Sequence, residues 1–521
     1  MGTDDVQSID PASGIENVLL IVADQWRGDH LKATGHPLLD LPNLEALQAE
    51  GTTFTKHYVQ CAPCGPARTS LHTGLYMMTH RAVRNSTPLN GDFTNIAKEV
   101  RKKSYDPCLV GYTTTTPDPR ETHPNDPRFY VLGDIMEGWR EITSFAPSKA
   151  PYQGHLRKHG YDVPLDRDPT YWRPRVGDYG PSAEPTAIAA ELSDTVWLAN
   201  CGLDFLRGRL GEKWFLHLGF YRPHPPFIAP PGYHDLYQPA ELPKPVRAAS
   251  SQAEGAQHPL LKFYLDTVEN AKFFEGAEGL GGNLSDEQVG LMRAAYCGMI
   301  KEIDDQLGRV FAYLKETGQW DKTLIIFTSD HGEQLGDHHL LGKLAYFDES
   351  YHIPMIVRDP RPEANAGRGR IVNHFSEQID VMPTILEWIG QEVPRQCDGR
   401  SLLPWCRGET PADWRAHVHY EFDFRDCITE EPQRTLGLHM DECSLAVIQD
   451  ERYKYVHFAT LPPLLFDLES DPGQFTNLAD DPAHTAVVLE YAQAMLSWRM
   501  RHADKRLTGY TASFDGLIER R

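Results

Sequence analysis

The chain has 521 residues, a hydrophobic content of 40% and a formal net charge of −22 at pH 7. This length and hydrophobic content predict a globular protein with one large domain and a smaller one, and exclude a disordered chain. The acidic charge disfavours non-specific binding to nucleic acid or to an anionic membrane, so an anionic substrate must be attracted by local positive groups.

The cysteines and the apolar runs indicate the compartment. Nine cysteines, an odd number without a repeating framework, are typical of reduced thiols. The first apolar run, Val18–Ala23, is too short for a secretory signal and follows acidic residues, and no run reaches the length of a membrane span. We therefore expect a cytoplasmic protein without a membrane partner.

The first strand is predicted at Asn17–Ala23, a continuous apolar run of the kind that parallel strands buried on both faces show. It ends in Asp24 and Gln25. Open α/β sheets place their sites at the carboxyl ends of parallel strands, so Asp24 is a candidate site residue. A turn or helix-capping role for Asp24 remains the alternative.

The segment that follows contains a thiol, a proline and an arginine at Cys64, Pro66 and Arg68. Pro66 suits the first turn of a helix, which places Cys64 at or just before the helix N-terminus and Arg68 one turn later on the same face. The free N–H groups and the dipole there favour negative charge. The segment therefore predicts a nucleophile in an anion-binding site, and we expect the helix to continue through Leu75–Val83.

Two other interpretations of Cys61 and Cys64 are a redox pair and half of a zinc site. A thioredoxin-like unit is small, whereas this pair lies within a much larger chain. A structural zinc site of this kind would need a second Cys-x-x-Cys, and the sequence contains none. Both interpretations are therefore less favoured.

Further along, Leu109–Asp118 begins as a β-prone run and ends as a turn that contains Tyr112 and Thr114. Its hydroxyl groups could line an oxyanion pocket, although a threonine run is also typical of a β-rich surface. Residues from about 120 to 180 are rich in Pro, Gly, Asp and Arg. They predict a long insertion that shapes the substrate entrance.

A second buried strand is predicted at Lys213–Phe220, and His224 follows it between prolines. These prolines stiffen the loop, so His224 is well placed to donate a proton, although a lone histidine is more often structural. A third such strand, Thr323–Ser329, ends in Asp330 and His331. Two buried strands that each deliver an aspartate to one sheet edge satisfy the need of a metal site.

Several helices are predicted from apolar periodicity and from capping residues. The strongest begins with a capping box at Ser285 and Gln288 and serves packing. The predicted helices are Pro42–Gly51, Thr186–Arg207, Leu284–Thr317, Ile379–Gly390 and Val487–His502.

The character of the chain changes after about Leu403. Short β-prone segments predict a small antiparallel sheet, and the tail Ala503–Arg521 has too little periodicity to pack on itself. We expect a catalytic domain at 1–402 and a smaller domain at 403–521 whose tail contacts another subunit. The β-prone segments are His417–Phe424, Ser444–Ile448 and Tyr453–Phe458.

The pattern Cys64-x-Pro66-x-Arg68-x-x-x-x-Thr73-Gly74 resembles the signature of the sulfatase family within the alkaline phosphatase superfamily. The resemblance implies an α/β sandwich with a large, mostly parallel central sheet flanked by helices, and a smaller C-terminal antiparallel sheet with a helix. It also implies that a maturation system converts Cys64 to formylglycine, whose hydrate is the nucleophile.

The resemblance further implies one divalent cation held by Asp24, Gln25, the modified Cys64, Asp330 and His331. Oxygen ligands with one imidazole favour manganese, with calcium, iron and zinc as alternatives. Other residues are expected to bind substrate oxygens or to protonate the leaving oxygen. Arg68, Lys343, Asn85, Tyr112 and Thr114 are candidates for the first role, and His224 or Lys343 for the second.

Within the family, the chain resembles the phosphonate monoester hydrolase and phosphodiesterase branch. Two motifs support this resemblance. Asp24-Gln25 stands where sulfatases usually have paired acids, and Gly111-Tyr112-x-Thr114 is not followed by the Gly-Lys-Trp-His of sulfatases. The branch implies hydrolysis of phosphonate monoesters and phosphate diesters, promiscuity toward phosphate monoesters and sulfate or sulfonate esters, and a homo-oligomer, which we expect to be a tetramer.

Three alternatives remain at this point. An arylsulfatase would share every motif except the missing Gly-Lys-Trp-His. A superfamily isomerase or two-metal phosphatase would use Ser or Thr with more acidic ligands, which the cysteine signature counts against. In a non-catalytic binding module, Cys64 would remain an ordinary thiol.

Overall fold

A computed structural model describes residues 16–145, 149–163 and 179–520. At its centre β1 (Asn17–Asp24) lies between β7 (Phe215–Pro223) and β8 (Thr323–Ser329), and both neighbours run parallel to it. Every residue of β1 is buried. The three strands predicted from continuous apolar runs are thus confirmed, and their carboxyl ends share one edge of the sheet.

The central sheet has eight strands in the order β11-β2-β10-β8-β1-β7-β5-β6. β5 (Pro107–Gly111) and β6 (Arg140–Ser144) extend it in parallel, whereas β10 (Met355–Arg358) is antiparallel to β8. β2 (Thr52–Phe54) and β11 (Arg370–Val372) complete the other edge. The sheet is therefore mostly parallel, as expected.

The predicted insertion between about 120 and 180 contributes β6 to the edge of this sheet and also contains α5 (Ala150–Lys158). The sequence did not indicate either element, because neither has a long periodic pattern. Residues 146–148 and 164–178 of the insertion lie outside the described residues.

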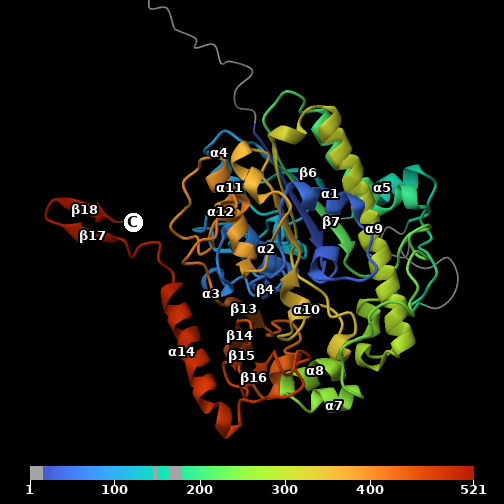
Figure 1. Cartoon of the computed structure of the whole chain (residues 1–521), viewed down its shortest axis with the longest axis vertical. Coiled ribbons are helices and arrows are strands. Elements are labelled where there is room, and N and C mark those ends of the chain that lie inside the picture. The colour runs from blue at the N-terminus through green and yellow to red at the C-terminus, as the bar shows by residue number, and fades with distance from the viewer. Residues whose placement is uncertain (1–15, 146–148, 164–178, 521) are drawn as a thin grey trace, which may run out of the picture.

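Helices cover both faces of the sheet (Figure 1). Alternate residues of β1 pack on opposite faces: Leu19 and Ile21 belong to one hydrophobic cluster, and Leu20 and Val22 to the other. One layer contains α1 (Pro42–Glu50), α6 (Asp194–Arg207) and α9 (Asp286–Glu316). The opposite layer contains α4 (Ile96–Arg101), α11 (Val381–Trp388) and α12 (Leu403–Cys406).

The smaller sheet near the C-terminus packs on α14 (Thr485–Arg501) through Tyr491 and Trp498. Its antiparallel strands are β13 (Val418–Asp423), β14 (Ser444–Gln449), β15 (Tyr453–Phe458) and β16 (Leu464–Asp467). A fifth strand, β4 (Cys61–Ala62), pairs in parallel with β13. The segment that precedes Cys64 is therefore part of the C-terminal sheet, while the division of the chain at 402 stays a prediction.

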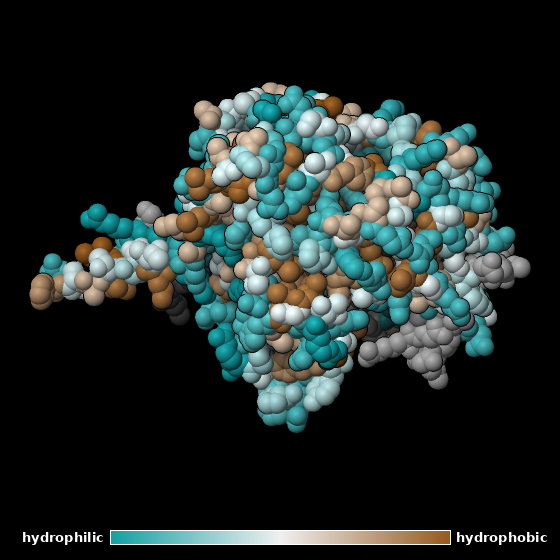
Figure 2. All heavy atoms as spheres, turned by 90° about the horizontal axis from the view of Figure 1, so that it is seen from below, coloured by the Kyte–Doolittle hydropathy of each residue, from teal (hydrophilic) through white to brown (hydrophobic). Residues whose placement is uncertain are grey.

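The tail forms a hairpin of β17 (Tyr510–Ser513) and β18 (Gly516–Glu519), which projects from the body of the protein (Figure 1). All eight strand residues are exposed, and apolar side chains are visible along this projection (Figure 2). The expectation that the tail does not pack on itself was wrong in one respect, because its two strands pair with each other. No helix within the described ranges combines the length and hydrophobicity that crossing a membrane requires.

The helix that carries the nucleophile segment, α2 (Cys64–Thr73), begins at Cys64 as predicted but ends earlier. Gly74 adopts φ 68°, and its N–H donates to Ser70 O at 2.9 Å. The predicted continuation through Leu75–Val83 was wrong because this left-handed residue closes the helix. A separate short helix, α3 (Met77–His80), follows.

Gly74 allows a test of this helix end, with Gly390 after α11 as a matched control. Both have φ 68°, but a Cβ at Gly74 would meet Cys397 Sγ, whereas a Cβ at Gly390 would meet nothing within 4 Å. We expect Gly390→Ala to lower the free energy of unfolding by about 1–2 kcal/mol from backbone strain alone. Gly74→Ala should cost about 1–3 kcal/mol more, because overpacking is added. Equal losses in urea denaturation would contradict this steric role.

Candidate active site

The carboxyl ends of β1 and β8 and the N-terminus of α2 bring four potential ligands together. Asp24, Cys64, Asp330 and His331 are all buried, and one ligand atom of each lies within 4.8 Å of the others. Cys64 Sγ lies 3.1 Å from His331 Nε2 and 4.0 Å from Asp24 Oδ1. Residues more than 300 positions apart in the chain thus form one cluster.

His331 has the tautomer that a metal ligand needs. Its Nδ1 lies 3.0 Å from Gly332 O, and because a carbonyl oxygen only accepts, Nδ1 carries the proton. Burial lowers the pKa of His331 to about 3, so the ring is neutral. Nε2 therefore presents a lone pair to the cluster, an arrangement typical of metal-binding histidines.

The two aspartates give this cluster buried negative charge. Burial, together with the neighbouring Asp330, raises the pKa of Asp24 to about 6. Burial also opposes ionisation of Asp330, but His331, which is protonated at the low pH where Asp330 titrates, and Arg68 outweigh it and hold the pKa of Asp330 below its ordinary value. Two carboxylates and one neutral imidazole fit a divalent cation, which would relieve the repulsion between the two acids.

The thiol of Cys64 is poorly suited to act as a thiolate. Burial, with the nearby Asp24, raises the pKa of Cys64 to about 12, so the thiol is protonated at neutral pH. Each of the nine cysteines lies in the described part of the chain and is free, and Cys61 Sγ faces Ser70 Oγ at 3.4 Å. This environment disfavours a redox pair, which requires a lowered pKa.

Arg68 holds the two acids in place. Its buried guanidinium donates from Nε to Asp330 Oδ2 at 2.9 Å and from Nη2 to Asp24 Oδ2 at 3.2 Å. The third nitrogen, Nη1, donates to Tyr112 O at 2.8 Å, and the ring of Tyr112 lies 4.2 Å from the guanidinium carbon. The Tyr112 hydroxyl also donates to Asp24. Arg68 and Tyr112 therefore position the acids, and their contact with substrate oxygens stays a prediction.

Gln25 and Lys343 contact each other at the edge of the cluster. Lys343 Nζ donates to Gln25 Oε1 at 2.6 Å, and Gln25 Nε2 donates to Glu333. Glu333 also accepts from the backbone N–H of Gly342 at 2.6 Å and of Leu335 at 3.1 Å. This buried carboxylate, to which we assigned no role from the sequence, fixes both Gln25 and the loop that carries Lys343. In the sequence, the role of Glu333 is indicated only by its place as a second acid shortly after the strand Thr323–Ser329.

Asn85 and Thr114 lie beside the start of α2. Asn85 Oδ1 accepts from the Gly65 N–H at 2.7 Å, and Thr114 adopts φ 56°. A Cβ at Gly65 would lie 3.1 Å from Thr114 O and from the Asn85 side chain. The glycine therefore permits both residues to approach the helix N-terminus.

His224 follows β7 near the same edge. Its ring lies 4.6 Å from the ring of Tyr221, and its Nδ1 lies 2.8 Å from Pro225 O. Burial and the nearby Lys343 lower the pKa of His224 well below its ordinary value. In the free protein the ring is therefore neutral, with its proton on Nδ1.

Comparisons with known sequences identify relatives of this chain. Residues 16–391 match the family model described as Sulfatase, and residues 336–501 match that of the N-sulphoglucosamine sulphohydrolase C-terminal region. The multifunctional alkaline phosphatase superfamily protein PehA of Trinickia caryophylli is 55% identical over 97% of this chain and 99% of its own length. An arylsulfatase of Clostridium perfringens is 27% identical over 95% of this chain and 96% of its own.

Solved structures agree as well. The phosphonate monoester hydrolase of Agrobacterium radiobacter has a TM-score of 0.94 at 43% identity, covering 97% of this chain and 100% of its own. The phosphonate monoester hydrolase of Silicibacter pomeroyi has a TM-score of 0.91 at 40% identity, covering 97% of this chain and 99% of its own.

Removing Arg68 tests the charge balance of the cluster. In metal-free protein, Arg68→Ala should lower the free energy of unfolding by about 3–5 kcal/mol, because it leaves two buried carboxylates unpaired. Arg207→Ala, which breaks the exposed pair with Asp204, should cost about 0–1 kcal/mol. Urea denaturation of both variants measures these losses. Similar losses in the free energy of unfolding would show that Arg68 does not stabilise the two buried carboxylates.

Proposed function

Because the chain belongs to the sulfatase family, we propose that it is a metal-dependent hydrolase of phosphonate monoesters and phosphate diesters. The observation that carries this proposal is the buried cluster of Asp24, Cys64, Asp330 and His331 at the start of α2. The names of the two similar solved structures support phosphonate monoesters as the substrate class. Phosphate monoesters and sulfate or sulfonate esters are proposed as secondary substrates.

The proposed chemistry requires two groups besides the encoded side chains. A divalent cation, with manganese favoured, supplies charge stabilisation, and formylglycine made from Cys64 by a maturation system supplies the nucleophile. Asp24, Asp330 and the unprotonated Nε2 of His331 would hold the cation, with the modified Cys64 and Gln25 as the other proposed ligands. In the free protein Gln25 Oε1 accepts a hydrogen bond from Lys343 Nζ at 2.6 Å.

Lys343 is the proposed proton donor to the leaving oxygen. Burial alone lowers the pKa of Lys343, but the carboxylates of Asp24, Asp330 and Glu333 outweigh it and raise the pKa above its ordinary value. The ammonium is therefore charged in the free protein. His224 has no proton on Nε2 in that state, so it would first have to gain one when an anionic ester binds.

The arylsulfatase alternative shares the same cluster, and a relative described as an arylsulfatase is 27% identical. The two proposals differ in the preferred ester. We expect kcat/KM to be higher for a phosphonate monoester than for a sulfate ester with the same leaving group. The reverse order would favour the arylsulfatase.

A homo-oligomer, which we expect to be a tetramer in the cytoplasm, is the proposed assembly. The free cysteines fit a reducing compartment. Leu507, Phe514 and Leu517 on the projecting tail are 78%, 112% and 70% exposed. Such an apolar projection is better explained by contact with a second copy of this chain than by contact with water.

Cys64 provides the direct test of the mechanism, with the neighbouring buried Cys61 as a matched control. The peptide that contains Cys64, isolated from protein made in its own host, should have the mass of an aldehyde or its hydrate. Cys64→Ala should lower kcat by about four to six orders of magnitude, as loss of a nucleophile does. Cys61→Ala should retain most of the activity. An unmodified thiol in fully active protein would refute the mechanism.

Removing residues 509–521 tests the role of the hairpin. Static light scattering should give a tetramer for the full chain and a smaller species for the shortened chain, because the exposed apolar side chains of the hairpin are lost. The double substitution Phe514→Ser and Leu517→Ser should have the same effect with the backbone intact. An unchanged mass for both would show that the hairpin does not support assembly.

A further inference from the structure

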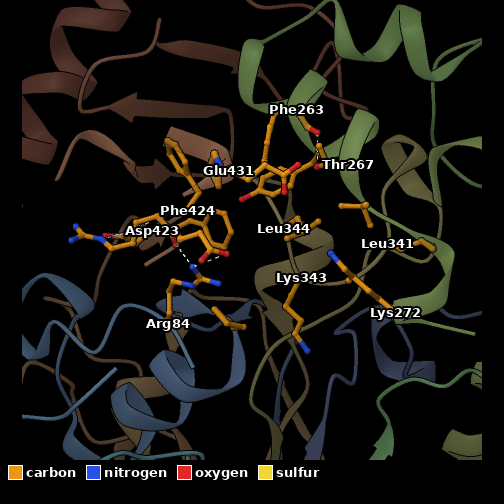
Figure 3. A pocket seen from close by; sticks show the side chains of 18 of the residues that line it. Arg84, Phe263, Thr267, Lys272, Leu341, Lys343, Leu344, Asp423, Phe424 and Glu431 are labelled. Atoms are coloured by element: carbon orange, nitrogen blue, oxygen red, sulfur yellow. Dashed lines mark hydrogen bonds and ion pairs between the residues drawn. The ribbon is translucent and has the colours of Figure 1, made fainter. Parts of the chain in front are cut away.

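A cavity of about 300 Å³ lies between the loop that carries Lys343 and the end of β13 (Figure 3). Its walls come from α8 (Pro259–Thr267), from that loop and from the C-terminal part of the chain. Five of the residues that line the cavity are aromatic, and each of these residues is at most 9% exposed. The aromatic residues are Phe263, Tyr264, Phe273, Phe422 and Phe424.

The cavity adjoins the candidate active site. Pro63, which directly precedes Cys64, and Lys343 both line it. In Figure 3 the ammonium of Lys343 points away from the aromatic rings, and its partner there is Gln25 of the active-site cluster. The cavity and the active-site cluster therefore adjoin at Lys343 and at the residue before Cys64.

The charges around the cavity are unequal. Arg84 pairs with Asp426 at 3.3 Å, and Arg425 pairs with Asp423 at 2.8 Å, so these rim charges compensate each other. The ammonium of Lys272 points into the cavity in Figure 3, and no ion pair links it to a described carboxylate. Lys343 and Glu431 also line the cavity, and neither has an ion pair with another described residue. The cavity therefore combines aromatic side chains with unpaired charges of both signs, and Lys272 is one of its two unpaired cations.

We propose that this cavity binds the leaving group of the ester, and that the group it selects is an aromatic alcohol with a negatively charged or electron-rich ring substituent near Lys272. The inference rests on the proposed function and adds the part of the substrate that determines specificity. A dry cavity of about 150 Å³ holds benzene, so 300 Å³ provides room for a substituted ring. Aromatic walls favour such a ring through stacked and edge-to-face contacts, and Lys272 attracts its substituent.

The test compares phenyl methylphosphonate with trifluoroethyl methylphosphonate, which has a small leaving group. Phe422→Ala and Phe263→Ala should lower kcat/KM for the phenyl ester by about 10- to 100-fold, as the loss of a buried aromatic contact does. For the trifluoroethyl ester, kcat/KM should change by less than about twofold, which would also show that the variants are folded. Phe263→Leu removes the ring but keeps most of the volume, so it should lower kcat/KM for the phenyl ester by a smaller factor. Phe205→Ala, on α6 and remote from the cavity, is the control.

Lys272 is tested with a para-carboxyphenyl ester. Lys272→Gln should lower kcat/KM for this ester about five- to tenfold relative to the unsubstituted phenyl ester. Lys272→Arg keeps the positive charge, so it should restore the native ratio of kcat/KM for the two esters. Equal losses for the phenyl and trifluoroethyl esters in the Phe variants would overturn the inference while the proposed function stands. If the native protein hydrolyses neither phosphonate ester, the proposed function fails and the inference fails with it.

Discussion

The interaction on which the site depends is the buried contact of one arginine with two aspartates. Arg68 on α2 donates to Asp24 at the end of β1 and to Asp330 at the end of β8. Burying two carboxylates is costly unless a cation with matched geometry lies between them, and the planar guanidinium supplies that match. The helix and both strands are therefore held in one arrangement, and this arrangement brings Cys64 to His331.

A series of hydrogen bonds fixes the residues next to this cluster. Glu333 joins Gln25 to the backbone of the loop at Gly342, and Lys343 closes the chain by donating to Gln25. A flexible lysine in a surface loop would have many positions. Here its ammonium donates to Gln25 Oε1 at the edge of the cluster, and the nearby carboxylates keep it charged.

The C-terminal sheet contributes to the site as well as to the core. Its strand β13 pairs with β4, the short strand just before Cys64, so the start of α2 is attached to the C-terminal sheet, while Arg68 joins the same helix to Asp24 and Asp330 of the central sheet. Phe422, which pairs with Ala62 of β4, and Phe424, just after β13 ends, line the cavity beside Lys343. The same strand therefore positions the nucleophile segment and part of the cavity wall.

The sequence by itself determined the buried parallel strands, the acids that follow two of them and the helix start at Cys64, because these features depend on local apolar runs and on a proline in the first helical turn. Only the tertiary structure revealed the role of Glu333, the edge strand β6 and the hairpin of the tail. Backbone pairing and buried hydrogen bonds depend on neighbours that are distant in sequence. The end of α2 at Gly74 also required the structure, since glycine tolerates both a helical and a left-handed backbone.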